Sequence, residues 1–191
     1  PGFGSAAAAD GQRYPYISPI PAAYWSQPAA ATDFAKKQLG GSLKGKKIAY
    51  LFYDNPAGRE PIDLLGDLAE IEGFQLKTFA VPPPGVEMGA QVLDIAQRFR
   101  ADFVISHLFG GAPSVSINEL KRVGYPMRKV IGMVWASAEA NIEGAGGFGV
   151  AACTVSRVRP RVVPNPIGTG ATPGAVISAE DGSFRLVAGE M

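Results

Sequence analysis

The sequence predicts an α/β fold in which helices cover both faces of an open parallel sheet. Apolar runs of strand length alternate with amphipathic segments of helical period across the middle of the chain. The clearest unit is Lys47–Tyr53 (KIAYLFY), which runs into a polar loop containing Gly58 and then into an amphipathic segment that begins at Pro61. Strands and helices that alternate in this way are joined by right-handed crossovers, which makes the sheet parallel.

The strands and helices of this sheet can be placed from the pattern. Buried strands are expected at Lys47–Tyr53, Gln75–Val81, Asp102–His107 and Lys129–Val134. Amphipathic helices are expected at Ser26–Leu39, Pro61–Glu72, Val86–Phe99 and Pro113–Val123. The alternation also predicts a helix after Glu139, although the residues from Gly144 onward do not have a helical pattern.

Several details of the helices are predicted as well. Ser26 is expected to cap the first helix and Gly40-Gly41 to end it. Ser116 and Glu119 have the spacing of a capping box. The buried face of the third helix is predicted to carry Val86, Ala90, Leu93 and Ala96.

The two ends of the chain differ from the middle, so we divide the sequence into three parts. Residues 1–41 are a crossover segment with the first helix, 42–147 an α/β lobe and 148–191 an irregular tail. Four prolines from Pro15 to Pro28 forbid a long helix early in the chain, and short strand character is expected around Tyr16–Ile20. The aromatic residues of this segment either pack over a neighbouring surface or line a pocket: Tyr14, Tyr16, Tyr24 and Trp25.

The tail has two interpretations. It is either a terminal extension with a hairpin about Asp181-Gly182, or an out-of-frame translation of a GC-rich gene, whose products are rich in Ala, Gly, Arg, Pro and Val. The abrupt change in composition favours the second interpretation.

Composition excludes several classes of function. The net charge of the 191 residues is +1 and no dense Lys/Arg cluster is present, so no nucleic-acid partner is expected. No apolar run is long enough to cross a membrane, and Cys153 is the only cysteine. His107 is the only histidine, metal-ligand spacings are missing and no dinucleotide fingerprint follows the first strand. We therefore expect neither metal nor cofactor.

A ligand site is expected at the carboxyl ends of the strands, where open parallel sheets bind ligands. The loops at these ends are Tyr53–Glu60, Val81–Gly85, Ser106–Pro113 and Trp135–Glu139. Ser106 and His107 are adjacent on a strand and point to opposite faces, so they do not form a nucleophile–base pair. His107 is either a structural hydrogen-bonding residue or a ligand contact, and Trp135 is either a ligand contact or part of the packing between lobes. The geometry is one of binding and requires no catalytic group.

Four segments carry a resemblance to a known family. They are GFGSAAAADGQRYPYISPIPAAYWSQ, LKGKKIAYLFYDNPAGREPIDLL, ADFVISHLFGGAPSVSINELKRVGYP and VIGMVWASAEANIEGAGG. Through them, residues 1 to about 147 resemble the type I periplasmic binding proteins of bacterial ABC transporters, the leucine/isoleucine/valine-binding family. Such proteins have two α/β lobes that close on a ligand. The resemblance implies that this chain holds the crossover and most of the second lobe, without the first.

The resemblance also implies which residues contact a ligand. By position these are Asp54, Asn55, Ala57, His107, Phe109, Gly110, Trp135 and Ser137. Many relatives have an aromatic residue where this chain has Ala57. Because relatives bind the ammonium and carboxylate of an amino acid mostly through the first lobe, a lone second lobe is expected to bind weakly or not at all.

The function that follows is that of a solute-binding component of an ABC importer, or a fragment of one. It would capture an amino acid or similar small polar solute, work with a membrane permease without entering the membrane itself, and act in the periplasm or outside the cell. A ligand-sensing domain of the same fold and a truncated inactive product are alternatives. A small α/β enzyme is disfavoured by the shortage of catalytic groups.

Overall fold

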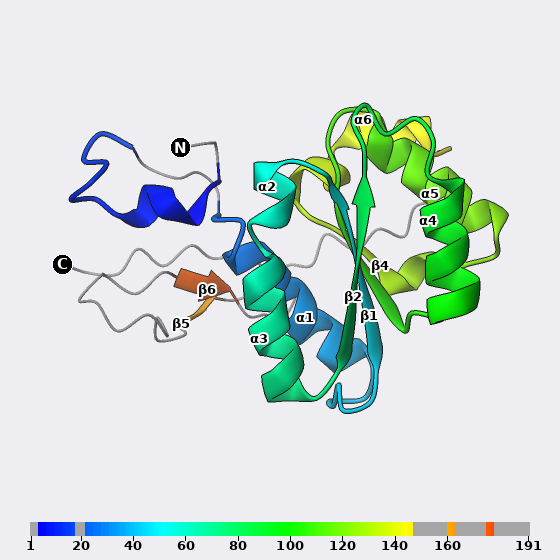
Figure 1. Ribbon diagram of the computed structural model, residues 1–191, viewed down its shortest axis with the longest axis horizontal. Helices are drawn as coiled ribbons and strands as arrows, with labels where there is room; N and C mark the ends of the chain where they lie inside the picture. The colour runs from blue at the N-terminus through cyan, green and yellow to red at the C-terminus, as the bar shows by residue number, and fades with distance from the viewer. Residues whose placement is uncertain (1–3, 18–21, 147–159, 163–174, 178–191) are drawn as a thin grey trace.

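The centre of the molecule is a four-stranded parallel sheet. A computed structural model describes residues 4–17 and 22–146 and two short strands at 160–162 and 175–177 (Figure 1). In the sheet the strands have the order β2-β1-β3-β4, and all neighbours run parallel. Their bounds are β1 Lys47–Tyr53, β2 Gln75–Val81, β3 Phe103–His107 and β4 Val130–Gly132. This arrangement confirms the predicted fold class.

Helices lie on both faces of this sheet. Figure 1 shows α3 and α1 on one side of it and α4 and α5 on the other. The α-helices are α1 Ser26–Gln38, α2 Pro56–Arg59, α3 Ile62–Glu72, α4 Gly89–Leu93, α5 Ala112–Arg122 and α6 Glu139–Gly144. Helix α4 continues as the π-helical segment η2 Asp94–Phe99, and the 3-10 helices are η1 Ala6–Ala9, η3 Met127–Lys129 and η4 Val134–Ser137.

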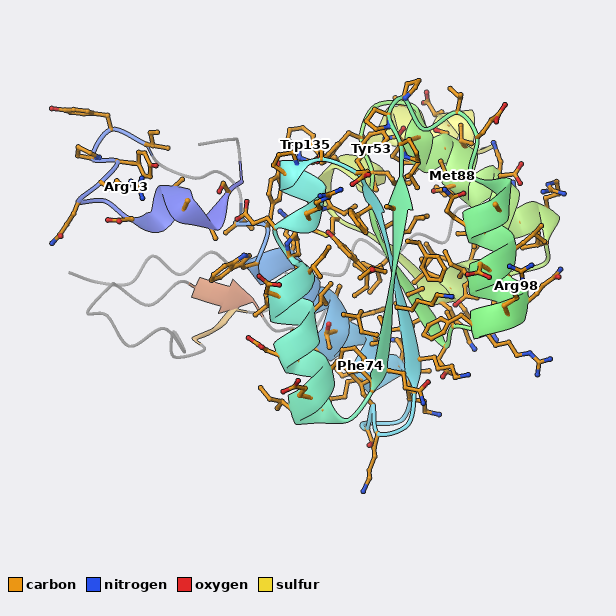
Figure 2. The ribbon with its side chains drawn as sticks, viewed as in Figure 1. Arg13, Tyr53, Phe74, Met88, Arg98 and Trp135 are labelled. Carbon is orange, nitrogen blue, oxygen red and sulfur yellow. The ribbon has the colours of Figure 1, made fainter. Side chains whose placement is uncertain are left out.

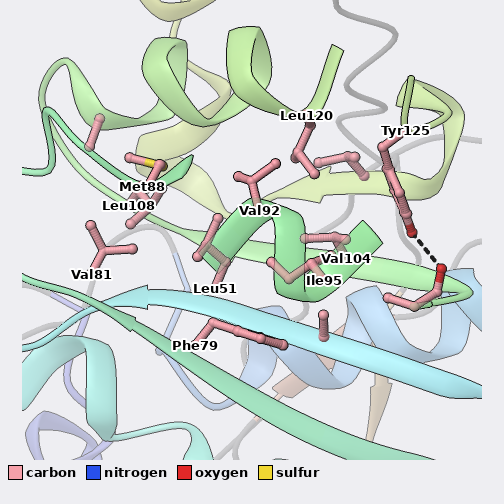
Figure 3. Close-up of a cluster of buried hydrophobic side chains, with 14 of the residues drawn as sticks. Leu51, Phe79, Val81, Met88, Val92, Ile95, Val104, Leu108, Leu120 and Tyr125 are labelled. Atoms are coloured by element: carbon pink, nitrogen blue, oxygen red, sulfur yellow. Dashed lines mark hydrogen bonds between the residues drawn. The ribbon is translucent and has the colours of Figure 1, made fainter. Parts of the chain in front are cut away.

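The strands bury alternate residues in two separate cores. Toward α1 and α3, the core contains Ile48, Tyr50 and Phe52 from β1 together with Phe103 and Ile105 from β3. The core under α4 and α5 contains the intervening residues of the same strands, and Figure 3 shows Leu51, Phe79, Val81, Val104 and Leu120 in it. A strand buried on both faces reads as a continuous apolar run, which is why β1 and β3 were visible in the sequence.

Hydrogen bonds close the amino-terminal edge of the sheet. The Asp102 carboxylate accepts from the backbone N–H of Lys47 at 3.0 Å, and the Tyr125 hydroxyl donates to the carbonyl of Ala101 at 3.0 Å (Figure 3). Asp102 therefore lies at the edge away from the carboxyl ends of the strands.

The capping predictions were wrong at two helices. Helix α1 has Trp25 as its N-cap residue, so Ser26 lies inside the helix. The helix ends at Gln38, with Leu39 as its C-cap residue, directly before Gly40-Gly41 as expected. Helix α5 begins at Ala112, so Ser116 is an interior residue whose hydroxyl donates to the carbonyl of Pro113 at 2.7 Å.

The predicted buried face of the third helix was wrong at three of its four positions, since Ala96 packs against the core but Ala90 is exposed. Val86 is 67% exposed and precedes the helix, and Leu93 is 41% exposed. The buried side chains are Met88, Val92 and Ile95 (Figure 3). These buried residues have the same helical spacing as the predicted set but lie two residues later, so the buried face is rotated from the predicted one.

The helix, strand and hairpin expected near the two ends of the chain have different outcomes. A short helix does follow Ala138, as α6. Tyr16 lies in a turn, and residues 18–20 of the expected strand are outside the described residues. Strand β6 Ala175–Ile177 pairs antiparallel with β5 Pro160–Val162, whereas the hairpin expected about Asp181-Gly182 is outside the described residues.

Two glycine substitutions, one in the tight loop between β1 and α3 and one within α3, test the geometry of that loop. A Cβ at Gly58 would overlap the carbonyl oxygen of Tyr53, so Gly58→Ala is expected to lower the free energy of unfolding by about 1–3 kcal/mol. At Gly66 in α3 a Cβ meets nothing within 4 Å, so Gly66→Ala is expected to raise it by about 0.5–1 kcal/mol. Urea unfolding of the two variants measures both values, and equal effects would contradict the loop geometry.

Candidate functional site

The carboxyl ends of the strands meet at one edge of the sheet. The parallel register places Phe52 of β1 beside His107 of β3, and Tyr53 beside Val81 of β2. Figure 2 shows Tyr53 and Trp135 at this edge and Phe74, which precedes β2, at the opposite end. The loops after β1, β3 and β4 therefore lie where the sequence predicted a ligand site.

Aromatic side chains gather at this edge. We call Tyr24, Tyr53, His107, Phe109 and Trp135 the aromatic cluster. The ring of Phe109 lies at the centre of the cluster. Its centroid is 5.0 Å from the ring centroid of His107, 5.4 Å from that of Tyr53 and 6.5 Å from that of Trp135. Trp135 is 38% exposed and Phe109 is half-buried, so the cluster presents apolar ring surface to solvent at the sheet edge.

The crossover segment completes the cluster. The ring of Tyr24 packs on His107 with centroids 4.7 Å apart, and its hydroxyl accepts from the indole N–H of Trp135 at 3.2 Å. Of the two alternatives for the aromatic residues of this segment, packing over a neighbouring surface describes Tyr24, which is itself buried.

His107 is fully buried and hydrogen-bonded on one side only. Its Nδ1 lies 2.8 Å from the Tyr50 hydroxyl oxygen, and that hydroxyl donates to the carbonyl of Gly58 at 2.9 Å. The Nε2 atom of His107 has no hydrogen-bond partner among the described residues. Burial lowers the pKa of His107 to about 4, so the ring is neutral at pH 7.

Tyr50 is also fully buried, and its hydroxyl takes part in both of these hydrogen bonds. Burial raises the pKa of its hydroxyl far above the usual range, and the charge of Glu60 adds to the shift. Sequence reasoning did not single out Tyr50, because it reads as one apolar position in a buried run. Tyr50 comes near His107 because it lies two residues before Phe52, the register partner of His107, and this register is known only from the folded chain.

The three predicted residues after β1 have defined neighbours. The side-chain oxygen of Asn55 caps α2 by accepting from the N–H of Gly58 at 2.8 Å. Asp54 forms an ion pair with Arg59, and Ala57 packs against the core that contains Tyr50. Asn55 thus shapes the loop, whereas Asp54 lies exposed at its surface.

The loop after β4 is held by hydrogen bonds from other elements. The backbone N–H of Met133 donates to the Ser106 carbonyl at 2.9 Å, that of Val134 donates to the Gln27 side chain at 3.0 Å, and Asn141 donates to the carbonyl of Trp135 at 3.0 Å. These bonds fix the backbone that carries Trp135. Ser137 ends η4, and its side chain is outside the described part of the structure.

Gly110 follows the cluster residue Phe109 in the loop after β3. Its φ of +59° lies in the left-handed region, and a Cβ there would meet no atom within 4 Å. Glycine is therefore favoured here by the backbone conformation and not by a neighbouring side chain.

The described residues contain no group of three or more His, Cys, Asp or Glu side chains that could hold a metal ion. No helix in that part of the chain is long and apolar enough to cross a membrane.

An open parallel sheet with aromatic side chains gathered at its carboxyl edge defines an α/β ligand-binding lobe. The family model described as periplasmic binding protein matches residues 1–159, and the chain therefore belongs to the periplasmic binding protein family. This finding confirms the resemblance seen in the sequence, and it confirms membership of a family of binding proteins rather than enzymes. A search of curated proteins finds no match.

Solved structures agree with this assignment. One described as an ABC transporter permease from the Pseudomonas fluorescens group is 35% identical, with a TM-score of 0.71 over 76% of this chain and 35% of that one. A branched-chain amino acid ABC transporter protein from Thermus thermophilus with bound valine is 22% identical, with a TM-score of 0.64 over 76% and 37%. A solute-binding protein from R. palustris in complex with benzoate is 19% identical, with a TM-score of 0.60 over 75% and 38%.

The chain spans little more than a third of the length of these proteins. The two matches under 25% identity show the shared fold, and the bound valine and benzoate belong to those proteins.

The buried histidine predicts a pH dependence of stability. The pKa of His107 is about 4 in the folded chain against an ordinary 6.5, so the unfolded chain binds more protons between these values. Its contribution to stability is complete above pH 6.5 and is lost as the pH falls toward 4, by about 3 kcal/mol in all.

Urea unfolding of the native chain and of His107→Gln at pH 7 and pH 4.5 measures this effect. The native chain is expected to lose more stability than the variant, because all other titrating groups are shared. Equal losses in the two proteins would show that His107 is not neutral and buried.

Proposed function

We propose that this chain is a portion of the solute-binding component of an ABC importer, in which the carboxyl edge of the sheet forms one wall of the ligand cleft. The observation that carries the proposal is the aromatic cluster at that edge, in a chain of the periplasmic binding protein family. Exposed ring surface next to a buried polar atom is the composition typical of small-molecule sites.

Within this function, the solute is an amino acid or a similar small molecule with an apolar part. The structure with bound valine and the structure with bound benzoate support this class, since both ligands combine an apolar body with a polar group. The contact residues would be Asp54, Asn55, Ala57, His107, Phe109, Gly110, Trp135 and Ser137. Of these, Phe109 and Trp135 offer the ring surface, and His107 offers a polar atom.

The partners follow from the same function. The whole protein would deliver its solute to a membrane permease and would work in the periplasm or outside the cell. Binding by this chain alone is expected to be weak, on the order of millimolar, since one wall supplies only part of the contacts and does not exclude water.

Tryptophan fluorescence tests the proposal. The sequence has two tryptophans, so Trp25→Phe leaves Trp135 as the only one. In this variant, titration with branched-chain and aromatic amino acids and small carboxylates to tens of millimolar is expected to change the emission of Trp135, because the solute covers its exposed ring.

The matched control is Trp135→Phe, which keeps Trp25 with its indole N–H bonded to the carbonyl of Glu60. Its emission should remain constant over the same titrations. Constant emission of Trp25→Phe with every solute of the panel would refute a ligand wall at this edge.

A further inference from the structure

The hydrogen bonds of Tyr50 determine which nitrogen of His107 carries the proton. A carbonyl oxygen can only accept, so the single hydroxyl proton of Tyr50 is donated to Gly58 at 2.9 Å. The bond of 2.8 Å between the same hydroxyl and His107 must then take its proton from Nδ1. The neutral ring is therefore the Nδ1–H tautomer, and its Nε2 atom is a hydrogen-bond acceptor with a lone pair.

This acceptor is buried without a partner in the described part of the chain. His107 is 0% exposed, and its Nε2 is one of two buried side-chain atoms there without a hydrogen bond. The other, the hydroxyl of Ser106, is on the neighbouring residue of β3, whose side chain points to the opposite face of the sheet. The two atoms therefore cannot satisfy each other, and a buried acceptor left unpaired is destabilising.

The surroundings of Nε2 limit what can reach it. Tyr24 and Phe109 pack on the ring of His107, and Phe109 is the more exposed of the two. We therefore expect a group that reaches the imidazole to do so past the ring of Phe109, whose centroid lies 6.5 Å from that of Trp135. Only a hydrogen-bond donor is favourable there, because a carboxylate oxygen would place negative charge against a lone pair.

We propose that His107 determines the class of solute by accepting, at Nε2, a hydrogen bond from an N–H or O–H group whose apolar body lies against Phe109 and Trp135. The inference rests on the proposed function and narrows it to donor-bearing solutes, such as amines, amides and alcohols. A carboxylate on such a solute points away from His107. Tyr50 acts as a positioning residue, since it fixes the tautomer without contacting the solute.

Nitrogen NMR of the full chain tests the tautomer directly, because His107 is the only histidine. With the imidazole labelled with ¹⁵N, the free chain at pH 7 is expected to show a protonated Nδ1 and an unprotonated Nε2. Tyr50→Phe removes the group that fixes the proton and should give a mixture of both tautomers. A protonated Nε2 in the native chain would overturn the inference.

Three probes with the same ring then test the solute class: benzylamine, benzyl alcohol and benzoate. The amine and the alcohol are expected to shift the Nε2 signal, and benzoate is not. In the Trp25→Phe background, His107→Phe should weaken binding of the amine and the alcohol about 3- to 10-fold and leave benzoate unchanged. His107→Gln keeps an acceptor oxygen at the site and should retain most of the affinity.

The outcomes separate the two proposals. Probes that change Trp135 emission but leave Nε2 and the His107 variants unaffected would refute the role of His107 while the binding function stands. Probes that change neither signal would refute the binding function, and the role of His107 with it.

Discussion

The hydroxyl of Tyr50 joins strand β1, the loop that follows it and the end of β3, which is 57 residues away in the sequence. It comes from the middle of β1, donates to Gly58 in the loop that follows that strand, and accepts from His107 at the end of β3. The group is buried, so both bonds form where water does not compete, and either partner left unpaired would be destabilising. The position of the α2 loop relative to β3 depends on these two bonds, as does the orientation of the imidazole on which Tyr24 and Phe109 pack.

The same edge shows a division between residues that shape the site and residues that face solvent. The Asn55 side chain accepts from the backbone N–H of Gly58 in its own loop, and Gln27 and Asn141 fix the loop of Trp135. The indole of Trp135 and the ring of Phe109 are thereby held at fixed positions, with part of their surfaces exposed. A rigid aromatic wall with one buried acceptor is suited to orienting a small solute, because little side-chain entropy is lost on contact.

The sequence predicted the sheet well and the side-chain bonds poorly, for physical reasons. Strands β1 and β2 matched residue by residue because residues that interrupt a strand lie close to their ends: Lys46 and Asp54 at β1, and Gly73 and Pro82 at β2. Strand β4 is shorter than expected because the chain turns into η3 before it and η4 after it. The buried face of the helix after β2 was mostly mispredicted, since Met88, Val92 and Ile95 form a second apolar set with helical spacing, two residues out of phase with the predicted one.

The positions of the candidate site were predictable because parallel strands bring their carboxyl ends to one edge. The bond between Tyr50 and His107 was not, because it depends on the pairing of Phe52 with His107, and strand register cannot be read from two separate apolar runs. Tyr24 was recognised as one aromatic residue among several, and only the folded crossover segment shows that it packs on His107.

The contacts of that crossover segment define the smallest unit that can be studied with an intact site. The backbone of Tyr24 donates to the carbonyl of Gly4 at 2.6 Å, and the N–H of Ala6 donates to the Glu60 carboxylate at 2.6 Å. A version of the chain trimmed to start at α1 would keep every strand of the sheet but would uncover the imidazole and remove the acceptor of the Trp135 indole. Truncation experiments therefore need to retain the segment from Gly4 onward. Tyr24, which belongs to the aromatic cluster, precedes the first helix and is held by this segment.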